Sequence, residues 1–146
     1  MIHDSRSIYT RELNFGGNQL TYQIAQTYKL TYADAEQAKI QGTLSNAYAT
    51  EILTPFKHNI VQQIQRRIQF FSTSQMNHPI DSVVLLGGCA AISGIDTLVS
   101  QALELPTCVA NPFIDMTYSA NINPQQVGNY ASSLLVACGL ALRHFD

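Results

Sequence analysis

The chain has 146 residues, of which 46% are hydrophobic and 12% charged, and its formal net charge is −2. This composition predicts a soluble globular protein with a proper core, and it argues against a nucleic-acid binder, which normally presents a basic face. The charged share is about half of the usual one, which hints that a partner normally covers part of the surface.

The first half of the chain is predicted to contain one strand and three helices. Alternating apolar residues predict a strand over residues 7–13, and apolar residues three to four apart predict a helix over 18–28. A Thr-x-x-Asp capping pattern predicts that a second helix begins near Tyr32. A long third helix is predicted over residues 49–71 from one apolar stripe. The stripe consists of Leu53, Phe56, Ile60, Ile64, Ile68 and Phe71.

Two features of this long helix have alternative interpretations. Pro55 lies near its start, where a proline is either tolerated or bends the helix locally. Arg66 and Arg67 lie on its polar side, and we expect them to form a solvated face rather than a partner contact.

The second half alternates strands and helices. Residues 82–86 predict a short buried strand, and residues 91–103 an amphipathic helix. A second short strand is predicted over 105–109, and an apolar helix over 127–143. Strands that alternate with helices predict an α/β fold.

Cysteine and histidine spacing predicts neither a disulfide framework nor a metal site. The three cysteines form no C-x-x-C pair, and the four histidines are scattered. The first ten residues contain no signal-peptide core, and the most apolar run, 131–142, is shorter than the roughly 20 residues that span a bilayer. Reduced thiols in a cytoplasm fit this pattern best.

A glycine pair follows the predicted strand at 82–86. Gly87 and Gly88 suit either a ligand at the carboxyl end of a sheet or tight backbone packing. The pair belongs to neither a phosphate-binding Walker loop nor a G-x-G-x-x-G fingerprint. Cys89 comes next. It is either a buried cysteine that only fills space in the core or a thiol whose pKa is lowered by the following helix, and the first interpretation is the simpler one.

A second glycine pair, Gly16 and Gly17, precedes the helix predicted over 18–28. The amides at a helix N-terminus suit a phosphate, whereas the alternative is an ordinary tight turn. Glu36 and Lys39, three residues apart, share a helix face. They form either a surface ion pair or a carboxylate for ribose hydroxyls with a lysine beside a base.

Several short segments stand in an order that fits one known family. They are Tyr9-Thr10-Arg11-Glu12, Phe15-Gly16-Gly17, Leu20-Thr21, Ala35-Glu36 with Lys39, Leu85-Leu86-Gly87-Gly88 with Gly94, Val109-Ala110-Asn111-Pro112-Phe113 and Gly139-Leu140-Ala141-Leu142-Arg143. Over nearly its whole length the chain thereby resembles the C-terminal half of the PilM family, actin-like proteins of type IV pilus assembly that are related to the cell-division protein FtsA.

The resemblance implies a nucleotide site and a role for each motif. Gly87 and Gly88, with Cys89 and onward to Ile92, would place backbone against the adenine and ribose of ATP. Glu36 and Lys39 would flank the ribose and adenine. Gly16 and Gly17 would stand near the phosphates, with Mg²⁺ bound in the full-length protein.

The resemblance also implies a fold and its subdivision. We expect the second domain, IIA with IIB, of the actin-like, RNase H-like ATPase superfold, with a mixed sheet and a helical insert. Residues 1–42 and 78–127 would form the IIA-like nucleotide-binding core, and residues 43–77 the IIB-like insert. Residues 128–146 would form the C-terminal connecting helix.

The sequence departs from an actin-like ATPase in one respect. Such enzymes hold Mg²⁺ and phosphates between two domains, with an Asp-x-Gly turn from each, and this sequence contains no Asp-x-Gly. We therefore expect the first domain to be missing, no catalytic residue to be present and no ATP to be hydrolysed by the chain alone, because phosphoryl transfer needs several positioned groups.

The resemblance predicts the ATP-binding half of a cytoplasmic assembly protein of the type IV pilus inner-membrane platform, which serves pilus biogenesis, twitching motility and DNA uptake. Its partner would be the cytoplasmic tail of a PilN-like membrane protein, docked mainly on the missing domain, so that the chain is peripheral to the inner membrane. The apolar terminal helix also predicts self-association or a domain swap.

Three alternatives remain open at this point. One is an FtsA-like division scaffold, which needs an amphipathic C-terminal anchor that the ending Arg143-His144-Phe145-Asp146 does not provide. Another is a sugar or acid kinase of the same superfold, which needs phosphate turns that are not visible. The last is a non-catalytic protein-interaction fragment.

Overall fold

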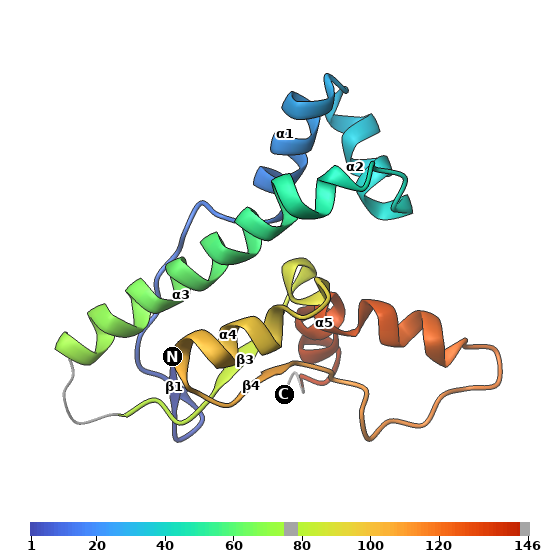
Figure 1. Cartoon of the computed structure of the whole chain (residues 1–146). Helices are drawn as coiled ribbons and strands as arrows, with labels where there is room; N and C mark the ends of the chain where they lie inside the picture. Colours follow the sequence, from blue (N-terminus) through green and yellow to red (C-terminus); the bar gives the residue numbers. More distant parts are fainter. Residues whose placement is uncertain (75–78, 144–146) are drawn as a thin grey trace. The chain divides into compact units, whose positions relative to one another are not determined.

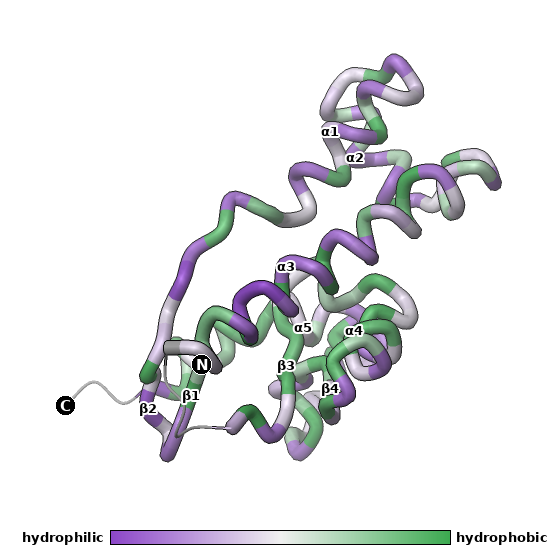
Figure 2. Tube along the Cα trace, turned by 60° about the vertical axis from the view of Figure 1, so that its left-hand side comes forward, coloured by the Kyte–Doolittle hydropathy of each residue, from purple (hydrophilic) through white to green (hydrophobic). Residues whose placement is uncertain are grey.

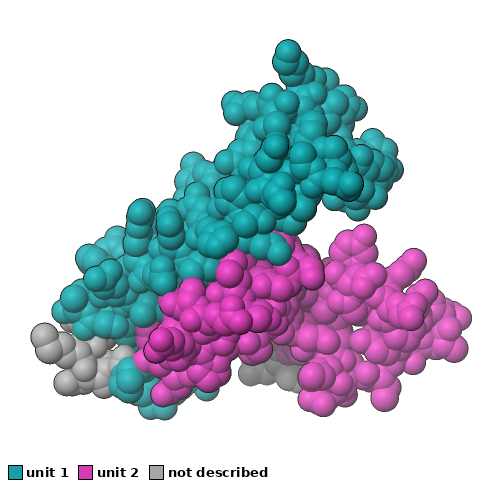
Figure 3. All heavy atoms as spheres, in the orientation of Figure 1, with its two compact units in different colours: residues 1–79 teal, residues 80–146 magenta. Residues whose placement is uncertain are grey.

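The computed structural model describes residues 1–74 and 79–143, and its fold divides into two compact units, Met1–Pro79 and Ile80–Asp146 (Figure 3). Each unit is considered by itself. His78, His144 and the boundary predicted between residues 77 and 78 lie outside the described residues.

The first unit begins with a two-residue hairpin and not with the predicted strand. Strands β1 (Ile2–His3) and β2 (Arg6–Ser7) pair antiparallel, with Ile2 opposite Ser7. The strand expected over residues 7–13 is therefore wrong beyond its first residue.

The reason is that the extended segment after β2 packs on a helix instead of pairing with a strand. The Tyr9 ring lies 5.5 Å from that of Phe71, and the Phe15 ring stacks on Phe56 at 5.2 Å between centroids. Six extended residues span about 20 Å, and the fifteen helical residues from Phe56 to Phe71 rise about 22 Å, so the segment runs along the long helix (Figure 1).

Helices α1 (Gly17–Tyr28) and α2 (Tyr32–Gln41) confirm two predictions and pack against each other (Figure 1). Leu20 and Ile24 of α1 are buried. The Thr31 side chain caps α2 by accepting a hydrogen bond from the Asp34 amide at 3.2 Å, as the capping pattern predicted.

The long helix is confirmed as a π-helical turn, η1 (Ala49–Leu53), that continues into α3 (Thr54–Ser74). The Thr54 amide donates to the Ala49 carbonyl, one residue further back than in an α-helix. Pro55 explains this widened turn, because proline has no N–H for the normal helical bond.

The apolar stripe of the long helix is only partly buried. Phe56 and Phe71 are core residues, and so are Ile52 and Val61, which the stripe did not include. Figure 2 shows hydrophilic and hydrophobic residues alternating along α3. Arg66 is exposed, as predicted. Arg67 is half-buried and its Nε is inaccessible to solvent, so the prediction that both arginines are solvated is wrong for Arg67.

The second unit contains two parallel strands joined through a helix. Strands β3 (Val83–Leu85) and β4 (Thr107–Val109) pair with Val83 opposite Thr107 and Leu85 opposite Val109. Both strands were predicted and are shorter than expected. The prediction that the first of them is buried is wrong within this structure, because Val84 and Leu86 are each 53% exposed. The connection runs through a 3₁₀ turn, η2 (Gly88–Ala91), and helix α4 (Ile95–Leu103), a parallel crossover that gives the unit its α/β character.

Two helix starts differ from prediction. Helix α4 begins at Ile95 and not at residue 91, because Ile92 is extended and Gly94 takes a left-handed φ of 71° that separates α4 from η2. Helix α5 (Pro124–Ala141) begins three residues earlier than predicted, since the Asn123 side chain caps it and Pro124 occupies its first position.

Among the described residues, no helix is long and apolar enough to cross a membrane. Across the same ranges, no cluster of three or more histidine, cysteine or acidic side chains is placed to hold a metal ion.

Candidate functional site

The first unit contains a compact polar cluster of Thr21, Glu36 and Lys39. Lys39 Nζ donates to Glu36 Oε2 at 2.6 Å and to Thr21 Oγ1 at 2.8 Å. Thr21 Oγ1 lies 2.5 Å from Glu36 Oε2 and 3.1 Å from the Gly17 carbonyl. One helical turn of α2 brings the acid and the base together, and α1 supplies the hydroxyl between them.

The cluster is sheltered on the helix side and open on the other. Thr21 is fully buried, whereas the side chains of Lys39 and Glu36 are 20% and 38% exposed. The hydrogen bond from Lys39 lowers the pKa of Glu36, and the bond from Thr21 lowers it further. Glu36 is therefore a fixed anion near neutral pH, with its charge partly neutralised by Lys39.

The first glycine pair stands next to this cluster, at the start of α1. Gly16 is the N-cap and has an extended φ of 175°, and no side chain caps the helix. A Cβ built on Gly16 would meet nothing within 4 Å. The first turn of α1 thus presents its positive end at an open position, an arrangement that can receive an anion.

At the second glycine pair, the backbone conformation itself requires glycine. Gly87 has a φ of 89° with an extended ψ, a conformation that is essentially restricted to glycine. Its amide donates to the Ser132 carbonyl of α5 at 2.8 Å. The position of a Cβ on Gly88 lies 4.0 Å from Ser133 Oγ, an ordinary contact distance. The near neighbour of this pair within the second unit is therefore helix α5, with open space remaining beside the glycines.

Cys89 and Ile92 continue the same turn. Cys89 is half-buried in η2, and Ile92 is the extended residue at which η2 ends. Four predicted residues, from Gly87 to Ile92, therefore form one short backbone element that follows the carboxyl end of β3.

Comparison with known proteins gives one family for almost the whole chain. The model of the family "Type IV pilus assembly protein PilM" matches residues 1–145. The chain belongs to the PilM family. The sequence resemblance to PilM is thereby confirmed, and type IV pilus assembly is the process in which the family acts.

A solved structure gives the fold of a PilM-family relative. It is described as "PilM-PilN type IV pilus biogenesis complex", and the chain superposes on it with a TM-score of 0.74 at 24% sequence identity. The match covers 91% of this chain and 38% of the other chain. The α/β fold predicted for the second domain of an actin-like protein is therefore confirmed, although the strands of the described residues form two separate pairs, one antiparallel and one parallel, and not one continuous mixed sheet. The chain spans well under half of its structural relative.

The structure gathers the eight predicted nucleotide-site residues of this PilM-family chain into two groups. Thr21 connects Gly17 to Glu36 and Lys39 in the first unit, with Gly16 as the adjoining N-cap. Gly87, Gly88, Cys89 and Ile92 form the second group, in the other unit. Their roles toward a nucleotide stay a prediction, and so does the division into subdomains.

Thr21 was missed as a site residue by the sequence reasoning, although Leu20-Thr21 was part of the family pattern. A signal was present: Thr21 lies four residues after Gly17 on the apolar side of α1, where a buried hydroxyl needs partners. Ser132 and Ser133 of α5, beside the second glycine pair, carried no comparable signal, because their proximity depends on how α5 packs.

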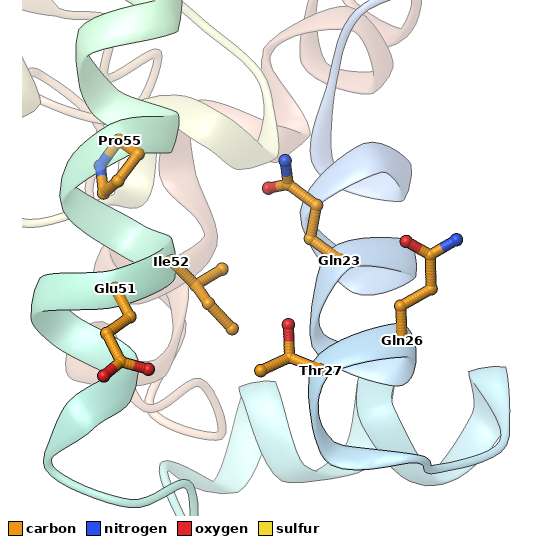
Figure 4. Close-up of a pocket in the computed structure, with 6 residues that line it drawn as sticks. All are labelled: Gln23, Gln26, Thr27, Glu51, Ile52 and Pro55. Carbon is orange, nitrogen blue, oxygen red and sulfur yellow. The ribbon is translucent and has the colours of Figure 1, made fainter.

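A small open hollow of about 160 Å³ lies elsewhere in the first unit, between α1 and the widened turn η1 (Figure 4). It is lined by Gln23, Gln26, Thr27, Glu51, Ile52 and Pro55. None of the predicted site residues lines it, and we assign it no role in the proposed nucleotide site.

Proposed function

We propose that this chain is the ATP-binding half of an actin-like assembly protein of the type IV pilus inner-membrane platform. The observation that carries the proposal is the Thr21–Glu36–Lys39 cluster beside the uncapped first turn of α1, in a chain that matches the PilM family over residues 1–145. A carboxylate, an ammonium group and a helix N-terminus next to each other provide complementary partners for ribose hydroxyls, a base and phosphates.

Each group has a distinct part in the proposed complex. Glu36 accepts from ribose hydroxyls, Lys39 lies beside the adenine, and the first turn of α1 faces the phosphates near Gly16 and Gly17. The backbone from Gly87 to Ile92 belongs to the other unit, and the role against the base and ribose that the family resemblance implies for it stays a prediction. ATP binding requires Glu36 and Lys39 to exchange part of their mutual bond for bonds to the ligand.

The proposal makes ATP a conformational ligand rather than a fuel for this chain. The described residues include no group of three metal-ligating side chains, so we place no Mg²⁺ ligand here and derive no chemical step. Phosphoryl transfer needs a positioned water and several groups that stabilise charge. We expect the purified chain to hydrolyse no ATP, and measurable turnover that is lost in Gly88→Val would contradict this.

Equilibrium binding of a fluorescent ATP analogue tests the nucleotide site. Lys39→Ala should weaken binding by about 10- to 150-fold, because a charged hydrogen bond contributes roughly 1.5–3 kcal/mol. Arg66→Ala removes one positive charge from the exposed side of α3 and serves as the control. Equal affinity of both variants and the unchanged chain would reject Lys39 as a ligand group, and absence of binding by the unchanged chain would reject the site.

We propose a PilN-like cytoplasmic tail as the partner that attaches this protein to the inner membrane from the cytoplasm. The support is the structural relative, which is described as a PilM–PilN complex. The tail is expected to dock mainly on a domain outside this chain. A labelled tail peptide should therefore bind the 146 residues weakly, and nanomolar binding in fluorescence anisotropy would place the docking surface on this half.

We also propose that α5 is covered by another protein surface, in self-association or a domain swap if no other domain is present. The helix exposes five large apolar side chains over its length, Tyr130, Leu134, Val136, Leu140 and the adjoining Leu142. Light scattering should detect a species larger than a monomer, and Val136→Lys should shift it toward the monomer. A monomer at high concentration in the unchanged chain would contradict the proposal.

A further inference from the structure

Thr21 lies at the junction of the two parts of the proposed site in the first unit. Its hydroxyl is fully buried and has three polar neighbours: the Gly17 carbonyl, Glu36 Oε2 and Lys39 Nζ. Lys39 can only donate, so it occupies a lone pair of Thr21 Oγ1. The single hydroxyl proton then has two acceptors, Glu36 and Gly17, and it can serve only one of them at a time.

The distances identify the acceptor in the ligand-free protein. The separation of 2.5 Å to the Glu36 carboxylate is typical of a hydrogen bond to an anion, whereas the 3.1 Å to the Gly17 carbonyl is longer. The Thr21 proton therefore resides with Glu36 Oε2, which also accepts from Lys39. Since these two donors use both lone pairs of Oε2, a ligand hydroxyl that donates to the same oxygen competes with Thr21, and the displaced Thr21 hydroxyl turns toward the Gly17 carbonyl.

A threonine hydroxyl that bonds to the carbonyl four residues earlier competes with the helical bond at that carbonyl and often bends the helix slightly. Gly17 is the first residue of α1, next to the open N-terminus proposed for the phosphates. A change of acceptor at Thr21 thus acts on the turn that would hold the phosphates, although Thr21 itself is buried below it.

We propose that Thr21 is a positioning residue that couples the ribose end of the nucleotide site, at Glu36 and Lys39, to the phosphate end, at the first turn of α1. The inference rests on the proposed nucleotide function and deepens it. It assigns a role to a hydroxyl that touches no ligand and acts through the three groups around it.

The first test is made without nucleotide and does not depend on ATP binding. NMR titration of the Glu36 side chain should show that its pKa rises in Thr21→Val, which keeps the shape and removes the hydroxyl, and returns in Thr21→Ser. Thr27→Val, an exposed position on the same helix, is the matched control and should leave the pKa of Glu36 unchanged. An unchanged pKa in folded Thr21→Val would overturn the positioning role.

The second test uses adenosine, which has no phosphates and cannot contact the α1 N-terminus through them. In the unchanged chain, adenosine should shift the NMR signals of both Glu36 and the Gly17 amide, and in Thr21→Val the shift at Gly17 should disappear. ATP affinity should fall about tenfold in Thr21→Val and recover in Thr21→Ser. A shift at Glu36 without one at Gly17 in the unchanged chain would overturn the coupling, even if Thr21→Val fails to fold.

The two tests separate the inference from the function beneath it. If neither adenosine nor ATP binds the unchanged chain, the proposed function fails, while the ligand-free pKa of Glu36 still decides whether Thr21 positions that carboxylate. If ATP binds the unchanged chain and folded Thr21→Val equally well, the function stands and the coupling is rejected.

Discussion

The two glycine pairs look alike in the sequence and differ in the structure. Each follows an extended segment and precedes helical structure, yet Gly16 has an ordinary extended φ of 175° and Gly87 a positive φ of 89°. At the first pair the chemistry lies in the neighbouring side chains of Thr21, Glu36 and Lys39. At the second it lies in the backbone, which only glycine can place in that conformation.

A Gly-Gly motif therefore has no single physical meaning. Glycine at position 16 leaves open space beside the backbone, whereas glycine at position 87 permits a positive φ. Only the dihedral angles distinguish the two cases. The consequences of substitution should therefore differ between the two pairs.

The helices that follow the two glycine pairs should each depend on one fully buried isoleucine for stability. Ile24 of α1 and Ile95 of α4 are both essentially inaccessible to solvent. Ile24→Ala and Ile95→Ala should each lower the free energy of unfolding by about 2–5 kcal/mol, since each removes buried methyl groups and leaves a cavity. Urea denaturation measures this, with exposed Gln26→Ala as the control; a loss below that of the control at either site would mean that its core is misassigned.

Alanine at the glycines should separate the two pairs directly. Gly87→Ala should cost about 1–3 kcal/mol because the positive φ strains any side chain, even though the space beside it is open. Gly16→Ala should cost less than about 1 kcal/mol, the usual penalty for a poorer N-cap. Equal losses in matched denaturation experiments would remove the distinction drawn between the pairs.

Alanine at a third glycine should stabilise the protein instead of destabilising it. Gly128 lies inside α5, and a Cβ there would meet nothing within 4 Å. Gly128→Ala should raise the free energy of unfolding by about 0.5–1 kcal/mol, because alanine restricts the unfolded chain and favours the helix. A loss of stability in thermal denaturation would reveal that another surface packs closely against this side of α5.

The smallest effect concerns acid. The pKa of Glu36 is held below its ordinary value of 4.5, chiefly by Lys39 and then by Thr21. A lowered pKa in the folded state stabilises the protein above pH 4.5, and this contribution is lost as the pH falls through the folded value. Solvent screening limits it to below about 1 kcal/mol, since Glu36 is partly exposed.

Urea denaturation of the unchanged chain and of Glu36→Gln at neutral pH and below pH 4.5 measures this contribution. The stability gap between the two should narrow on acidification, because glutamine does not titrate. A gap that stays constant or widens would show that the cluster does not hold Glu36 as an anion.

Local sequence signals predicted the helices better than the strands. The Thr31 cap, the apolar periodicity of α1 and the stripe of α3 each act within a few residues, and all three helices were confirmed. The strand over residues 7–13 failed because alternation describes an extended segment and does not reveal its neighbour. Here that neighbour is α3, through Tyr9 and Phe15.

Motif order and helical spacing are local properties of the chain, and they indicated the family, the α/β class and a shared helix face for Glu36 and Lys39. Packing in three dimensions was needed to show that these two side chains bond to each other and to Thr21, that Gly87 has a positive φ and that α5 lies against Gly87 through Ser132. These contacts link residues distant along the chain, and their geometry depends on how the helices pack, which no short sequence pattern records.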